Sequence, residues 1–413
     1  MTPIHHTFGP HIDGAYMRKV LAMSYAPWRY KRGKSVETLR NRLAEKFGGR
    51  CALFASGREA LLGYLRAINL KPGEEVIVQA YTCVVVPNAV HAAGGVAVYA
   101  DITEDTLNLS AESVGPLITA RTRAVICQHT FGIPSGTTAL RALCSEKKIL
   151  LIEDCAHVIP DETGPHEIGT LGDAVLLSFG RDKAVSGIAG GAFIVKDDAV
   201  AQKLLAMEAA APDLSLRQIT VLLEYASRMR SVIRPLIGTG MHRPVIAALN
   251  RLGIYAPILT EEEREGHMSP VLHRMPNACA FLALHSLSHL REINDHRRQL
   301  TAFYLEHGNR NGWPMLAAVH SSLPLQKFPL FVRGADAKRT ALKAHNVHLN
   351  DGWTGCVICP DTVDPADAGY DPGSDPKAEK VCRQILSLPT HPTMTIKQAV
   401  RLAGLIDESL SSQ

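Results

Sequence analysis

Short apolar runs alternate with helical patterns between Glu75 and Asp154. The apolar runs cover residues 76–79, 96–99, 124–127 and 149–153, and the helical patterns begin near Val84, Ser110 and Gly136. A strand that is apolar on both faces needs cover on both faces, and a helix between two strands allows them to run parallel. The alternation therefore predicts an α/β fold with a mostly parallel sheet and helices on both of its faces.

A lysine lies between two further apolar runs. Residues 174–177 and 192–195 are predicted strands, and Lys183 stands in the glycine-containing segment that joins them. Desolvating an ammonium group is costly, so a lysine between core strands is usually paired or used in chemistry. Burial lowers the pKa of a lysine and makes its amine available for a Schiff base. An exposed lysine in a hairpin loop explains this segment alone equally well.

An aspartate follows the apolar run 149–153. Asp154 stands at the carboxyl end of this predicted strand, where open α/β sheets bind ligands. Enzymes that use pyridoxal phosphate need a lysine for the cofactor aldehyde and an acidic or basic partner for its pyridine nitrogen. Lys183 and Asp154 lie one strand apart and can fill these two roles, although Asp154 could instead cap a helix. His129, after the run 124–127, could contact the cofactor or the substrate, but a packed loop histidine is the preferred interpretation.

A third segment has the pattern strand, turn and helix. Residues 51–54 are a predicted strand, Ser56 and Gly57 a turn, and residues 59–68 a helix. Backbone N–H groups at the beginning of a helix form an anion site. An ordinary helix cap at Ser56 is the alternative.

Together these segments resemble the DegT/DnrJ/StrS family of sugar aminotransferases, which are pyridoxal-phosphate enzymes of fold type I. The resemblance covers residues 35–200 densely and residues 270–410 thinly. It rests on the order and spacing of Ser56-Gly57-Arg58-Glu59-Ala60-Leu61, Pro72-Gly73-Glu74-Glu75-Val76, Asp101-Ile102, Glu153-Asp154-Cys155-Ala156-His157, Leu171-Gly172-Asp173-Ala174, Ser178-Phe179 before Lys183, and Leu386-Ser387-Leu388-Pro389-Thr390-His391-Pro392. It implies a fold type I large domain followed by a smaller C-terminal α+β domain. In that smaller domain, residues 324–332 and 346–358 are predicted short strands, and residues 378–386 and 396–406 are predicted helices.

The resemblance also implies roles for individual residues. Lys183 would form the Schiff base with pyridoxal 5'-phosphate, Asp154 would keep the pyridine nitrogen protonated, and His157 would form a hydrogen bond with the phenolic oxygen. The cofactor phosphate would be bound by Gly57, Arg58 and Ser178. No metal is expected.

The resemblance implies an aminotransferase that moves an amino group from glutamate or glutamine to a keto-sugar, expected to be nucleotide-linked. A homodimer with shared active sites is also implied. Two alternatives are a sugar dehydratase and a non-catalytic or regulatory protein of the same fold. Dehydratases of this family replace the lysine with histidine, whereas this chain has Lys183. The presence of both Lys183 and Asp154 argues against a non-catalytic protein.

Three positions depart from the family pattern. Cys83 stands where an aromatic residue often stacks on the cofactor ring, and Tyr81 could replace that residue only if its segment stays extended. Leu272 stands where many relatives have an asparagine that reaches the neighbouring subunit's cofactor phosphate. The His-Tyr pair that contacts the sugar in relatives has no clear match near residues 350–353.

Four parts of the chain are expected. They are an N-terminal arm (1–34), a large cofactor-binding domain (35–212), a basic helical insertion (213–265) and a smaller C-terminal domain (266–413). Residues 214–256 contain six arginines and one acid, Glu224, with apolar residues at helical intervals. Such a segment can lie on an anionic membrane, but packing on its own protein or on a dimer partner is the preferred interpretation.

Composition adds further limits. A net charge of +4 over 413 residues gives no indication of nucleic-acid binding. The beginning of the chain lacks the apolar core of a signal peptide, and no apolar run is long enough to span a membrane. Nine cysteines without a framework spacing favour free thiols in the cytoplasm. Cys356 and Cys359 form a lone C-x-x-C pair, for which a metal or redox role is not favoured.

Overall fold

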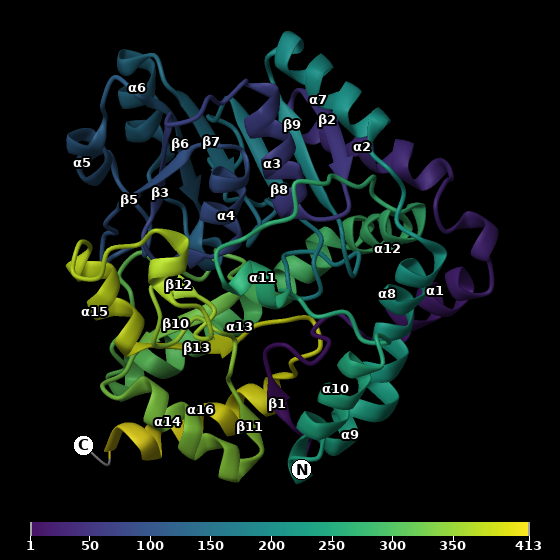
Figure 1. The fold of residues 1–413 in the computed structure, drawn as a ribbon. Helices are drawn as coiled ribbons and strands as arrows, with labels where there is room; N and C mark the ends of the chain where they lie inside the picture. Colours follow the sequence, from purple (N-terminus) through teal and green to yellow (C-terminus); the bar gives the residue numbers. More distant parts are fainter. Residues whose placement is uncertain (1, 412–413) are drawn as a thin grey trace.

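A seven-stranded sheet forms the centre of the computed structural model, which describes residues 2–411 (Figure 1). In spatial order its strands are β2 (Arg50–Phe54), β9 (Gly191–Val195), β8 (Ala174–Ser178), β7 (Leu150–Asp154), β6 (Thr122–Gln128), β3 (Glu75–Gln79) and β5 (Val96–Ala100). Strand β9 runs antiparallel to both of its neighbours, and the other pairs are parallel. The predicted α/β fold with a mostly parallel sheet is confirmed.

Helices cover both faces of this sheet. Helices α3 (Gly57–Ala67), α4 (Val85–Ala92) and α7 (Asp198–Ala210) cover one face, and α2 (Lys34–Phe47), α6 (Thr137–Lys147) and α12 (Asn277–Ser288) cover the other. Side chains alternate between the faces, so Val76 and Val78 pack with α3 and α4 while Ile77 packs with α6. Cover on both faces explains why the strands read as unbroken apolar runs.

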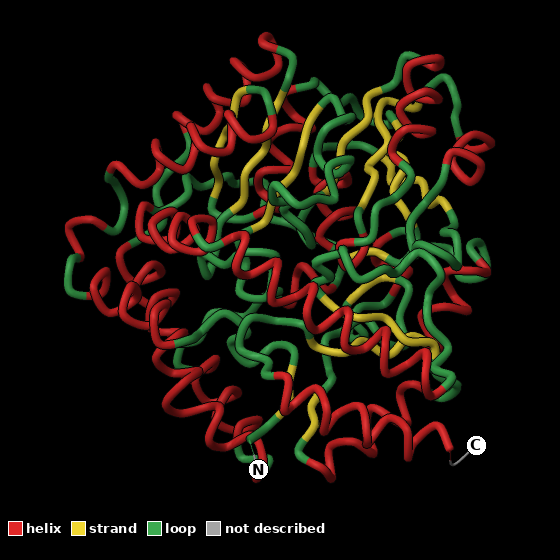
Figure 2. Tube along the Cα trace, turned by 180° about the vertical axis from the view of Figure 1, so that it is seen from behind, coloured by secondary structure: helices red, strands yellow, loops and turns green. Residues whose placement is uncertain are grey.

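The C-terminal part contains a two-stranded antiparallel sheet and several helices below the central sheet (Figure 2). Strand β10 (Lys327–Phe331) pairs with β13 (Ile385–Pro389), next to α13 (Leu290–Asn311), α14 (Ala335–Ala341), α15 (Pro376–Gln384) and α16 (Ile396–Ser411). The prediction that this last-but-one helix extends to Leu386 is wrong, because α15 ends at Gln384. The next five residues are all buried and pair with β10.

The predicted strand over residues 346–358 is also wrong in extent. Two short strands, β11 (Val347–His348) and β12 (Ile358–Cys359), stand at its ends. Strand β11 pairs with β1 (Ile4–His5) near the beginning of the chain, and β12 pairs with β4 (Thr82–Cys83). These pairings join the C-terminal part to two distant segments.

The segment 213–265 packs against the beginning of its own chain (Figure 1). Helix α8 (Leu216–Arg228) shares a hydrophobic cluster with α1 (Gly14–Ser24) and α12, and α9 (Arg234–Leu236), α10 (His242–Arg251) and α11 (Glu261–Arg264) follow it. Arg234 donates hydrogen bonds to the carbonyls of Phe8, Gly9 and Ile12. At least one arginine of this segment therefore binds backbone carbonyls of its own chain. Within residues 2–411, no helix combines the length and apolar character needed to cross a membrane.

Candidate active site

The site lies where the parallel strands end. Strand β7 ends at Asp154, between Gln128 of β6 and Leu176 of β8. Strand β8 ends two residues further, at Ser178, before the turn that carries Lys183. Polar groups from neighbouring strands therefore meet at the carboxyl edge of the sheet, where α/β folds bind ligands.

The first turn of α3 packs tightly against the ends of β8 and β9. A Cβ atom added to Gly57 would lie 3.1 Å from the Cβ and 3.2 Å from the Oγ of Ser178. One added to Gly191 would collide with the backbone of Gly57. Ser56 caps the helix, since its Oγ accepts a hydrogen bond from the N–H of Glu59 at 3.3 Å. The first-turn N–H groups and the Ser178 hydroxyl together form a cradle that fits a phosphate group.

Lys183 lies half-buried in the turn between β8 and β9. A Cβ atom on Gly180 would stand 3.3 Å from Cγ of Lys183 and 3.7 Å from Oγ of Ser178, so the lysine side chain passes close to the serine. Among residues 2–411, the ammonium of Lys183 has no hydrogen-bond or ion-pair partner. Its charge lowers the pKa of both Asp154 and His157. Lys183 is therefore an amine without a protein partner beside the predicted site residues.

Asp154 is a buried residue whose carboxyl group has one oxygen, Oδ2, without a hydrogen-bond partner among the described residues. Its Oδ1 accepts a hydrogen bond from the N–H of Ala156 at 2.9 Å, and no helix begins there, so it is not a helix cap. In the described part of the chain, no group donates a hydrogen bond to Oδ2. Burial raises the pKa of Asp154, although Ala156 and the charge of Lys183 lower it. A buried carboxylate with a free oxygen fits the N–H of a protonated pyridine ring.

His157 is buried and neutral. Burial holds its pKa well below its usual value, and the charges of Lys183 and Lys327 lower it further. Its Nδ1 accepts a hydrogen bond from the N–H of Phe131 at 3.2 Å, which places the ring proton on Nε2. The free Nε2–H can therefore donate to a phenolic oxygen.

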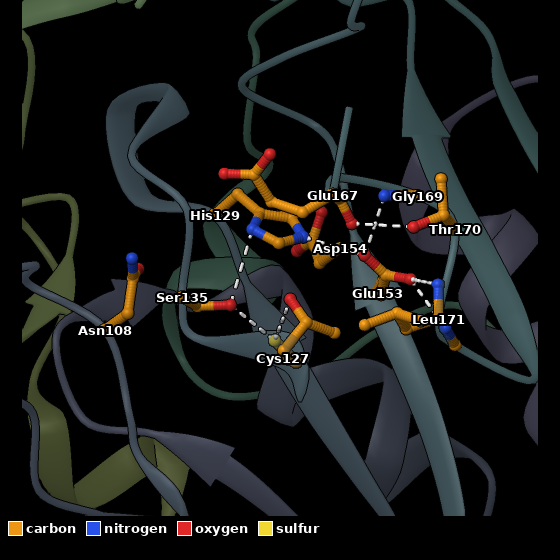
Figure 3. Close-up of polar contacts among 12 residues, drawn as sticks. Asn108, Cys127, His129, Ser135, Glu153, Asp154, Glu167, Gly169, Thr170 and Leu171 are labelled. Atoms are coloured by element: carbon orange, nitrogen blue, oxygen red, sulfur yellow. Dashed lines mark hydrogen bonds and ion pairs between the residues drawn. The ribbon is translucent and has the colours of Figure 1, made fainter. Parts of the chain in front are cut away.

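His129 lies next to Asp154 in a satisfied hydrogen-bond network (Figure 3). Its Nε2 is 3.1 Å from Glu153 and its Nδ1 is 3.3 Å from Ser135, and the side chain is fully buried. Glu153 also accepts hydrogen bonds from the N–H groups of Gly169, Leu171 and Gly172. This is the packed loop histidine that the sequence favours. His129, Glu153 and Cys155 lie close together, but both oxygens of Glu153 are already engaged by the protein.

The guanidinium of Arg58 is already paired within the protein. The group pairs with the carboxylate of Glu263 and donates to the carbonyl of Ile258 at 2.7 Å. Leu272 packs in the hydrophobic cluster beside α3, so it offers no polar group to a phosphate. A phosphate contact by Arg58 would therefore use its backbone N–H.

Cys83 stands at the end of β4. Burial raises the pKa of its thiol, and the nearby charge of Lys183 partly offsets this effect. Tyr81 does not take the place of the expected stacking residue. Its φ is 62°, so the segment is not extended, and its hydroxyl bonds to the carbonyl of Trp353 at 3.0 Å. Tyr81 is fully buried, and its ring centre lies 5.3 Å from that of Trp353.

Three residues at the site were not expected from the sequence. Lys327 pairs with Asp351 at 3.0 Å, and its ammonium lies 5.4 Å from the ring centre of Trp353. The ring of Trp353 is 5.1 Å from that of His157, so this group forms one wall of the site. The sequence contains one indication of this group, because Lys327 is a charged residue inside the apolar run 324–332. Its partners lie more than 20 residues away in the sequence, and only the fold brings them together.

The sheet, the cradle, and the position of Lys183 near Asp154 define a protein of the fold type I class, which binds pyridoxal phosphate. The chain belongs to the DegT/DnrJ/EryC1/StrS aminotransferase family, whose sequence profile matches residues 10–232 and 246–406. The resemblance seen in the sequence is therefore confirmed.

Two curated relatives and a solved structure illustrate this membership. GDP-perosamine synthase from Vibrio cholerae is 30% identical over 209 residues, which cover 50% of this chain and 56% of that protein. UDP-N-acetyl-3-dehydro-alpha-D-glucosamine 3-aminotransferase from Acidithiobacillus ferrooxidans is 25% identical over 86% of this chain and 83% of that protein. The structure of NtdA from Bacillus subtilis with the bound cofactor PMP superposes with a TM-score of 0.75, at 19% identity, over 100% of this chain and 86% of that one. At this identity the structural likeness shows the fold alone.

Proposed function

We propose that this protein is a pyridoxal-phosphate-dependent aminotransferase that moves an amino group from glutamate or glutamine to a nucleotide-linked keto-sugar. The observation that carries the proposal is the unpartnered ammonium of Lys183 beside the buried carboxylate of Asp154. The names of the two curated relatives, which contain GDP and UDP, support a nucleotide-linked acceptor. A dehydratase or a non-catalytic protein is not favoured, because both catalytic groups are present.

Each side chain has a defined task in this reaction. Bound pyridoxal phosphate supplies an electron sink for the carbon that loses its proton. Asp154 Oδ2 would hold the proton of the pyridine nitrogen, and His157 Nε2–H would donate to the phenolic oxygen. Gly57, the Arg58 backbone and the Ser178 hydroxyl would bind the phosphate. Lys183 Nζ would hold the cofactor at rest and then take the proton from the α carbon of the amino donor.

We further propose a cytoplasmic homodimer, with the four-part division of the chain given above. The family position that reaches a neighbouring phosphate is Leu272, so the dimer would have to supply that contact from another residue. Packing of residues 214–256 on their own chain supports the interpretation without a membrane.

An absorption spectrum tests the function directly. The purified protein with pyridoxal phosphate is expected to absorb visible light, and addition of glutamate or glutamine should bleach the visible band in favour of near-ultraviolet absorption. A protein that binds the cofactor but is not bleached by any amino acid would refute the aminotransferase proposal.

A further inference from the structure

Arg297 on helix α13 is an unpaired cation inside the protein. Its side chain is only 1% exposed, and Nε is buried without a hydrogen-bond partner. Within the described residues no carboxylate, carbonyl or hydroxyl pairs with its guanidinium. Burial alone lowers its pKa to about 10. The next residue shows the usual arrangement, because Arg298 pairs with Asp161 at 2.6 Å and with Asp295 at 2.8 Å.

A small cavity of about 10 Å³ lies at Arg297, next to the turn that carries Lys183. Asp182, the residue before Lys183, lines it together with Gln326 and Lys327. Gln326 donates to the carbonyl of Asp182 at 2.5 Å, and its own Oε1 is buried without a partner. The cavity therefore adjoins the catalytic turn and contains unsatisfied polar groups.

The opposite wall of the cavity is the N-terminal segment. His6 and His11 line it, and His11 Nε2 lies 2.8 Å from the carbonyl of Lys183. A cavity of this size has room for about one water molecule. A larger group can enter only if this wall moves outward.

We propose that Arg297 binds a carboxylate of the amino-acid donor. This inference rests on the proposed function, since a donor must reach Lys183 and every amino-acid donor carries a carboxylate. A buried cation without a partner is costly, and a guanidinium matches a carboxylate through two parallel hydrogen bonds. Lys327 adds positive charge at the same cavity, although Asp351 already pairs with it. The diphosphate of a nucleotide sugar is bulkier than a planar carboxylate and would need a larger displacement of the wall.

Half-reactions of the holoenzyme test this assignment. Arg297→Gln removes the charge and Arg297→Lys keeps the charge but loses the two-pronged geometry, whereas Arg291→Gln is the control. Arg291 lies on the same helix, but its side chain is 64% exposed. Bleaching of the visible band by L-glutamate and by L-glutamine gives the half-saturating concentration of each donor. α-Methyl-L-glutamate, which has no α proton to lose, measures binding without turnover.

We expect Arg297→Gln to raise the half-saturating concentration on the order of 100-fold, as for loss of one partner of a buried charge pair. Arg297→Lys should lie between it and the wild type, and Arg291→Gln should match the wild type. The resting visible band should be unchanged in all three. An effect on both donors identifies the α-carboxylate, and an effect on glutamate alone identifies the γ-carboxylate.

Two results would overturn the assignment while leaving the proposed function intact. One is an unchanged half-saturating concentration for both donors in Arg297→Gln, when the wild type is bleached normally. The other is a selective loss of inhibition by UDP and GDP, which would assign Arg297 to a diphosphate. A wild type that no donor bleaches would instead refute the function itself.

Thermal unfolding provides a measurement that does not depend on activity. Replacing an unpaired buried cation by a neutral chain of similar length removes a desolvation cost, so Arg297→Met should melt at the wild-type temperature or above it. A melting temperature several degrees lower would show that Arg297 serves the fold rather than a ligand.

Discussion

Replacing Asp154 with asparagine separates a catalytic role from a structural one. The change keeps the shape of the side chain, and the amide oxygen can still accept the 2.9 Å hydrogen bond from Ala156. It removes the negative charge that Oδ2 would present to the pyridine nitrogen. The fold should therefore be preserved while the chemistry is impaired.

The two effects have different signs. Without the carboxylate, the proton on the pyridine nitrogen is no longer stabilised, and we expect turnover to fall by about 100-fold to 10,000-fold, the range for a positioned acid or base. This corresponds to about 3 to 5 kcal/mol of activation free energy. Stability of the cofactor-free protein should move the other way or not at all. Burial raises the pKa of Asp154, so its ionisation costs stability as the pH rises through the folded-state pKa.

The assay therefore combines steady-state turnover with thermal unfolding of the cofactor-free protein at pH 5 and pH 8. Asp154→Asn should show no loss of melting temperature, and any gain should be larger at pH 8 than at pH 5, because a rise in pH favours ionisation of the buried wild-type carboxyl, which costs stability. Retained turnover together with a melting temperature several degrees lower would refute the reasoning and make Asp154 a structural residue.

Further variants test other parts of the site. Lys183→Ala should lose the visible band, and borohydride reduction of the wild type should label Lys183; a label on Lys327, the second amine at the site, would contradict the assignment. Gly57→Ala should weaken cofactor retention about tenfold because its Cβ crowds the neighbouring serine, as measured by titration with pyridoxal phosphate. Gly115→Ala, where a Cβ meets nothing within 4 Å, is the control. The segment 214–256 should show no binding to anionic liposomes at physiological salt, and co-sedimentation that disappears at high salt would contradict its packed role.

Local patterns in the sequence were sufficient for the sheet and for placing Asp154 and Lys183 near the carboxyl ends of its strands. The strands that flank Lys183 are short, apolar and buried on both faces, so composition and length identify them without knowledge of their neighbours. The prediction of a helix through Leu386 was wrong because the structure there depends on a distant part of the chain. Its last residues form β13 because they pair with β10, which lies more than 50 residues earlier in the chain. A pairing over that distance leaves no local pattern.

The walls of the site could not be predicted for the same reason. In the sequence, Lys327 is a charged residue in an apolar run, and only the fold shows that Asp351 pairs with it. Arg297 is one of several arginines in a polar helix, and only the fold shows that it is buried. The family pattern already showed that Cys83 and Leu272 differ from the residues usual at their positions. It could not show which other residues make the ring-stacking and phosphate contacts instead, because those side chains come together only in the folded protein.

The segment 213–265 is connected to the site through contacts with backbone carbonyls. Arg234 holds the carbonyls of Phe8, Gly9 and Ile12, and within the same segment His11 contacts the carbonyl of Lys183. Every residue type offers a carbonyl, so such contacts put no constraint on which side chains occupy residues 8–12. The N-terminal segment therefore shows no pattern in the sequence, although it closes the cavity beside the turn that carries Lys183. Its position depends on an arginine more than 200 residues away, and this couples the shape of the candidate donor site to the segment 213–265.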